Sequence, residues 1–277
     1  ARSWLSISRV LFALLFILLA ALYFIPFYWM FISALRDPDR IFADAGVFYP
    51  TAFNFSNYLR LFQERPFLQW FGNSLILTIA YAFVALVICT MGGYALAHYR
   101  FRGQNVIFLA ALGSTMVPFY LLLIPLFLIM VNTRLIDTYP GVILPLAATP
   151  FGLFFMRQFM SGISSELLDA ARVDGASEYR IFWSIILPLS KPAMGAMLIL
   201  FSLDMWNNLL WPLIVMRSDS HFPLAVGIAS MVNVYNPEYD LLMAASVLAT
   251  LPMLILFLLF QRQFITAMTA TGLLVEK

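Results

Sequence analysis

The sequence predicts an all-α, polytopic membrane protein with about six transmembrane helices. Of its 277 residues 62% are hydrophobic and only 11% are charged, with a mean hydropathy of +0.89. A soluble domain carries about a quarter charged residues. Six apolar stretches have roughly the ~20 residues that a helix needs to cross a bilayer. They are residues 10–34, 75–97, 106–131, 141–159, 191–216 and 241–260.

Composition also restricts the chemistry that we expect. The net charge is only +2, so no nucleic-acid partner is predicted. Cys89 is the single cysteine and is predicted to be a small packing residue. No nucleophile–base pair or metal-ligand spacing is present, so we predict no catalytic and no metal-binding residues. Neither Lys191 nor Lys277 follows a glycine-rich loop, which excludes a Walker A motif. If ATP drives this protein, another subunit binds it.

The first apolar stretch follows Arg2 and Arg9 and is interrupted by Pro26. A cleaved signal peptide has the same charge layout, but its apolar core is only ~7–15 residues. We therefore favour a retained first helix, and residues 1–70 are interpreted as this helix and an external loop with a short helix at 57–64. Residues 71–262 form the predicted core, and residues 263–277 a polar tail.

Prolines interrupt the later stretches and are expected to kink them, because neighbouring helices can satisfy the freed carbonyls. The tract Gly92–Ala97 consists largely of small residues, which let membrane helices approach closely.

Residues 160–190 form a polar loop inside this apolar core, and they read as two short helices. Ser164 or Ser165 can cap the first helix and Ser177 the second, while Gly175 can adopt the left-handed conformation that ends the first. Pro188 is expected to end the second helix. The residues expected to make the contacts of this loop are Glu166, Asp169, Ala170, Ala171, Asp174 and Gly175. A short amphipathic helix with alanines in its contact face can press closely into a groove on a partner.

Asp169-Ala170-Ala171, Gly175 and Ile185-x-Leu187-Pro188 together resemble the EAA loop of type I ABC importer permeases. In that family the loop is the coupling helix that docks on the cytoplasmic ATPase, and Asp169 stands here where the family usually has Glu. The resemblance implies a permease core, two ATPase subunits that hold ATP and Mg²⁺, and no cofactor on this chain itself.

Charge placement agrees with that implication. Six helices put both termini on one side, and placing them with the 160–190 loop in the cytoplasm puts ten of the 16 Lys and Arg residues inside. These are Arg2, Arg9, Arg100, Arg102, Arg157, Arg172, Arg180, Lys191, Arg262 and Lys277. The positive-inside rule therefore favours a multi-pass protein of the inner or plasma membrane with cytoplasmic termini.

The fifth stretch contains a carboxylate, Asp204, about 20 Å along a helix from Lys191. On a continuous helix Asp204, Asn207, Asn208 and Trp211 share one face. Because charge in lipid is costly, this stripe is expected to face either a water-filled translocation path or polar partners on neighbouring helices. Both interpretations remain open from the sequence.

Trp206-Asn207, Asn73-Ser74-Leu75 and Phe222-Pro223-Leu224 further resemble the carbohydrate, maltose-type branch of the family. That resemblance implies a sugar or oligosaccharide as substrate, a second homologous permease subunit and an extracytoplasmic solute-binding protein. Three alternatives remain: an ion-coupled secondary transporter that uses Asp204, a non-sugar ABC permease, and a membrane scaffold that transports nothing.

Overall fold

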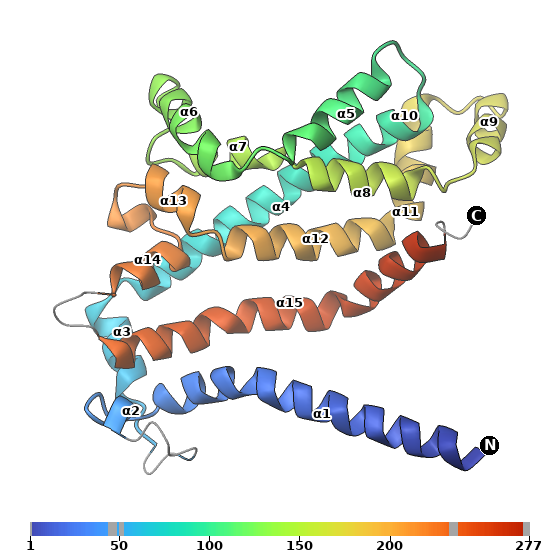
Figure 1. The fold of residues 1–277 in the computed structure, drawn as a ribbon. Helices are drawn as coiled ribbons and strands as arrows, with labels where there is room; N and C mark the ends of the chain where they lie inside the picture. The colour runs from blue at the N-terminus through green and yellow to red at the C-terminus, as the bar shows by residue number, and fades with distance from the viewer. Residues whose placement is uncertain (1, 44–48, 50–52, 233–237, 274–277) are drawn as a thin grey trace. The chain divides into compact units, whose positions relative to one another are not determined.

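The computed structural model describes residues 2–43, 49, 53–232 and 238–273, and among these the regular secondary structure is entirely helical. The predicted all-α class is confirmed. The chain divides into two compact units. Figure 1 shows the helices that belong to them. The smaller unit comprises residues 1–68 and 228–251, and the larger one residues 69–227 and 252–277.

The smaller unit is built on α1 (Arg2–Ser33), α2 (Arg40–Ala43), α3 (Ser56–Glu64) and the first part of α15 (Tyr239–Leu273). The predicted helix at 57–64 is confirmed as α3. The buried Asn57 amide of α3 donates hydrogen bonds to the carbonyls of Ala34 and Arg36 at 3.0 and 2.8 Å. Arg60 pairs with Asp240 at 2.6 Å, so α3 is tied both to the chain after α1 and to the start of α15.

The larger unit contains the loop and the stripe that the sequence singled out. Its helices are α4 (Phe67–His98), α5 (Gln104–Ser114), α6 (Phe119–Asn132), α7 (Tyr139–Ala147), α8 (Pro150–Met160), α9 (Ser165–Val173), α10 (Glu178–Ile181), η1 (Phe182–Ile186), α11 (Leu187–Leu189), α12 (Lys191–Trp206), α13 (Leu210–Val215), η2 (Asp219–His221) and α14 (Leu224–Ser230).

Helix α8 packs against α5 and α12, and it also meets α4 closely. A Cβ atom on Gly93 would lie 2.7 Å from the Met156 Cβ, so α4 needs glycine where α8 crosses it. On the other side, a Cβ on Gly152 would lie 2.6 Å from the Phe201 ring and 2.8 Å from the Cys89 sulfur. The predicted close approach at Gly92–Ala97 and the packing role of the buried Cys89 are both confirmed.

Among the described residues, three helices are long and apolar enough to cross a membrane: Arg9–Ser33, Phe67–His98 and Tyr239–Arg262. Three bent helix pairs bring the number of candidate spans to six. The interruptions expected at the prolines are confirmed: within 106–131 and 141–159, α5 and α6 meet at 105° and α7 and α8 at 49°. Pro118 is the N-cap residue of α6 and Pro150 is the first residue of α8, because proline lacks the N–H that a continuous helix requires.

The last helix is longer than predicted. The sequence placed a span at 241–260 and a polar tail at 263–277, but α15 continues to Leu273 despite Pro252. Residues 274–277 lie outside the described residues. The polar tail residues up to 273 thus continue the backbone helix of the last apolar stretch.

Candidate coupling loop and translocation site

The loop at 160–190 folds as the sequence predicts over its first half. The Ser164 hydroxyl accepts a hydrogen bond from the Glu166 N–H at 3.2 Å and caps α9. Gly175 follows α9 with φ of +77°, in the left-handed region that favours glycine. Ser177 then caps α10 by accepting from the Arg180 N–H at 3.3 Å. The second helix continues from α10 through a π-helical turn η1 into α11 and ends at Leu189, one residue after Pro188, so its predicted end is confirmed.

One arginine joins the two halves of this loop. Arg172 on α9 donates to Asp169 at 2.6 Å and, through Nε, to Glu178 on α10 at 2.7 Å. The hydrogen bonds with Glu178 and then with Asp169 raise the pKa of Arg172, so the guanidinium stays charged. The loop is therefore braced across Gly175 by charge-assisted hydrogen bonds, which are stronger than neutral ones.

Glu178 also connects the loop to the end of α4. It accepts from the Tyr99 hydroxyl at 2.6 Å and from the Tyr94 hydroxyl at 3.3 Å. The sequence did not single out Glu178, Tyr94 or Tyr99. An acidic residue directly after a capping serine is a signal for Glu178, whereas nothing local in the sequence pairs it with tyrosines some 80 positions earlier.

Burial separates the anchoring side of α9 from its free side. Leu168 is buried in the core beside Ile181 and Ile186, and Ala171 is half-buried. The other expected contact residues are exposed: Glu166, Asp169, Ala170, Asp174 and Gly175. Large apolar side chains are exposed beside them, with Val173 at 88% and Tyr179 at 75%. The loop thus presents a mixed apolar and acidic surface.

The predicted stripe on the fifth stretch is arranged differently from expectation. α12 ends at Trp206, Asn207 is its C-cap, and α13 begins at Leu210. The expectation of one continuous helix is therefore wrong. The Asn207 amide donates to the Leu203 carbonyl at 2.8 Å, and the Asn208 side chain accepts from the Trp211 N–H at 3.3 Å. The Asn208 side chain thus supplies an acceptor to the first turn of α13, and the Asn207 amide adds a second donor to the Leu203 carbonyl, which also accepts from the Asn207 N–H at 3.2 Å.

Three of the four stripe residues meet at one cavity. Asp204, Asn207 and Asn208 line a cavity of about 560 Å³ together with Tyr120. Asp204 accepts from the Tyr81 hydroxyl of α4 at 2.9 Å. Trp211 does not reach this cavity: it is fully buried, and its indole N–H donates to the Gly141 carbonyl of α7 at 3.1 Å. The structure therefore groups the carboxylate with the two amides and assigns the indole to the packing between α13 and α7.

The sequence of this chain matches a family of known membrane proteins. A family described as binding-protein-dependent transport system inner membrane component matches residues 89–269. The chain belongs to this family.

The permease is also similar to individual members along nearly its whole length. The arabinooligosaccharides transport system permease protein AraQ of Bacillus subtilis is 42% identical over 271 residues, covering 96% of each chain. The lactose transport system permease protein LacG of Rhizobium radiobacter is 34% identical over 251 residues, covering 91% of each. A solved bacterial ABC transporter involved in the import of the acidic polysaccharide alginate superposes with a TM-score of 0.83 at 25% identity, covering 93% of this chain and 96% of that one.

The family match includes the coupling loop and the cavity at the α12–α13 break. Within the described ranges 2–43, 49, 53–232 and 238–273, no three His, Cys, Asp or Glu side chains come close enough together to hold a metal ion.

Proposed function

We propose that this permease is one of two homologous subunits forming the membrane path of an importer for a sugar or oligosaccharide. Two separate ATPase subunits, which hold ATP and Mg²⁺, dock on the coupling loop. An extracytoplasmic binding protein delivers the solute on the opposite side. In this arrangement the termini and the coupling loop are cytoplasmic, which agrees with the bias of Lys and Arg residues.

The brace between Arg172 and Glu178 supports the coupling role most directly. A partner protein can move the membrane helices only through an element that keeps its shape and is attached to those helices. A tightly packed element transmits a displacement, whereas a loose loop does not. α9 meets both conditions, because Arg172 ties it to α10 and Glu178 ties that pair to Tyr99 at the end of α4. The exposed surface around Asp169, Ala170 and Val173 then remains free for docking.

The cavity at the helix break supports a role in solute passage. Sugars are bound by planar polar side chains, and a carboxylate with two amides offers both acceptors and donors. The similar proteins named for arabinooligosaccharides, lactose and alginate favour a carbohydrate. A non-sugar solute is the remaining alternative, whereas membership of a binding-protein-dependent family does not favour uptake driven through Asp204 by an ion gradient.

The test is uptake by the whole transporter, reconstituted in liposomes with its second permease, ATPase subunits and binding protein. We expect uptake of labelled arabinooligosaccharide or lactose that requires ATP and the binding protein and resists ionophores. A Walker A lysine substitution in the ATPase should abolish it. Uptake that follows an ion gradient without ATP would overturn the proposal, and uptake of only non-sugar solutes would overturn its substrate class.

A further inference from the structure

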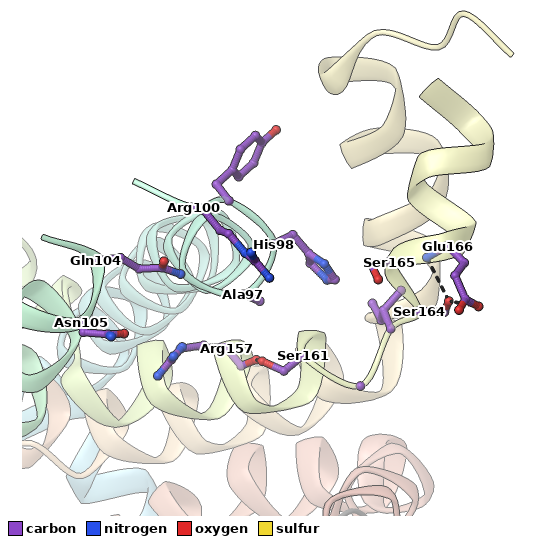
Figure 2. Close-up of a pocket in the computed structure, with 13 residues that line it drawn as sticks. Ala97, His98, Arg100, Gln104, Asn105, Arg157, Ser161, Ser164, Ser165 and Glu166 are labelled. Carbon is purple, nitrogen blue, oxygen red and sulfur yellow. Dashed lines mark hydrogen bonds between the residues drawn. The ribbon is translucent and has the colours of Figure 1, made fainter. Parts of the chain in front are cut away.

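A polar pocket of about 600 Å³ lies beside the coupling loop and includes its first residues; here the ends of α4 and α8 face the starts of α5 and α9 (Figure 2). Its lining includes His98, Arg100, Gln104, Asn105 and Arg157. In Figure 2 Gln104, Asn105 and Arg157 are gathered on one side of the pocket, and Ser164 to Glu166 of the coupling loop lie on the other.

Arg157 is held as a preorganised fork. Its Nε donates to the Leu96 carbonyl at 3.1 Å, and its guanidinium carbon lies 3.6 Å from the centre of the Phe108 ring. The terminal nitrogens of Arg157 make no hydrogen bond or ion pair with the part of the chain that the structure describes. The Nε edge of the guanidinium is therefore held by a hydrogen bond and one of its faces by an aromatic ring. The two terminal nitrogens remain free to donate side by side, which is the geometry in which arginine binds a phosphate.

The neighbouring side chains add donors and leave the pocket positive. Arg100 is exposed and unpaired among the described residues, as is the Asn105 amide, and the Gln104 amide donates to the Leu96 carbonyl at 2.8 Å. The His98 Nε2–H donates to the Met160 carbonyl at 2.9 Å and is not available. Glu166 is the single carboxylate in the lining, against two arginines.

We propose that this pocket binds a phosphate-bearing anion, through Arg157 and Arg100 with amide donors beside them. The anion is either the headgroup of an anionic phospholipid or a soluble phosphate compound. Basic pockets between membrane helices on the cytoplasmic side hold anionic headgroups, and the pocket lies where α4 ends and Arg100 and Arg102 follow. The class of anion does not depend on the coupling role proposed above, because it is inferred from the charge and geometry of Arg100 and Arg157.

The experiment is a titration of the delipidated, complete transporter complex, with bound lipid counted by native mass spectrometry. Phosphatidylglycerol, phosphatidylcholine, glycerol phosphate and inorganic phosphate are titrated separately. Phosphatidylglycerol or a soluble phosphate should bind, and Arg100→Gln and Arg157→Gln should each weaken that binding about fivefold. The matched control is Arg102→Gln, which removes an exposed charge from the same loop but does not line the pocket, and should change binding less than twofold.

The ligands distinguish the source of the phosphate. Binding of phosphatidylglycerol but not of glycerol phosphate identifies a lipid headgroup, and the reverse identifies a soluble anion. Equal binding of phosphatidylcholine, or equal losses in all three arginine variants, would overturn the proposal. Because Arg157→Gln also removes a contact with Leu96, Arg157→Lys serves as a charge-preserving variant, and Arg100→Gln, which breaks no described contact, decides the outcome if Arg157→Gln fails to fold.

Discussion

The coupling loop and the α12–α13 break are both polar interruptions of an apolar chain, but they are built by opposite means. In the coupling loop the caps, the left-handed Gly175 and the pair of Asp169 with Arg172 all join residues within a few positions of one another. At the break, Asp204 is matched by Tyr81 of α4 and Trp211 by Gly141 of α7. The caps and the turn of the first region are specified locally, although Glu178 also binds Tyr94 and Tyr99 near the end of α4, whereas the second region depends on helices that pack against it.

This difference determines how each region can move. A locally braced loop keeps its shape when the rest of the molecule shifts, which suits an element that transmits a force. A break whose polar groups depend on neighbouring helices changes its partners when those helices slide, which suits a path that opens and closes. Four experiments test the comparison, from the largest expected effect to the smallest.

Gly175→Val should abolish uptake while leaving the permease in the membrane and ATP hydrolysis running. A Cβ at this position would meet open space, so the damage comes from the positive φ of 77°, which disfavours a β-branched residue by about 1–3 kcal/mol. Uptake and ATPase rates are measured on the same reconstituted complex. Gly175→Asn is the control, because asparagine tolerates the left-handed region, and full coupling in the valine variant would show that the turn is unnecessary.

Trp211→Ala should destabilise the permease by about 3–5 kcal/mol, since it empties a fully buried site and leaves the Gly141 carbonyl without its donor. Asn207→Ala removes only a bond to the Leu203 carbonyl on its own helix, and should alter solute preference with little loss of stability. Thermal unfolding of the purified permease separates the two. Similar destabilisation by both substitutions would favour interhelical packing as the role of the whole stripe.

Glu178→Gln should lower coupled uptake about fivefold, because it weakens the bonds from Arg172 and Tyr99 by ~1 kcal/mol after allowance for exposure. Asp39→Asn is the matched control: it neutralises an exposed carboxylate outside the loop and should leave uptake unchanged. The ratio of solute imported to ATP hydrolysed is the relevant measurement. An unchanged ratio in Glu178→Gln would mean that the brace does not carry the coupling.

Cysteine labelling tests access of small polar reagents to the cavity. In a Cys89→Ser background, single cysteines at 204, 207 and 208 should react with a small polar thiol reagent, and the pattern should change when ATP binding is trapped. Ser202→Cys is the control, since Ser202 lies on α12 but is only 3% exposed and should stay unreactive. If cysteines at the three cavity positions react with the reagent as slowly as the cysteine at position 202 in every state, the cavity is not part of a solute path.

The sequence by itself determined the membrane class, the number of candidate spans and the local geometry of the coupling loop. Hydropathy and helical length decide the spans, and the caps Ser164 and Ser177 with Gly175 act over a few residues, so their effect can be predicted without neighbours. The roles assigned to the individual site residues stay predictions.

Only the tertiary structure decided where helices break and which distant side chains meet. The predicted continuous helix from Asp204 to Trp211 was wrong, because Asn207 and Asn208 satisfy the backbone at a break that helical periodicity does not reveal. The partners Tyr81, Tyr99 and Gly141 lie about 70 to 120 positions from the residues they bond. Hydrogen bonds of that kind depend on how whole helices pack, which no short stretch of sequence encodes.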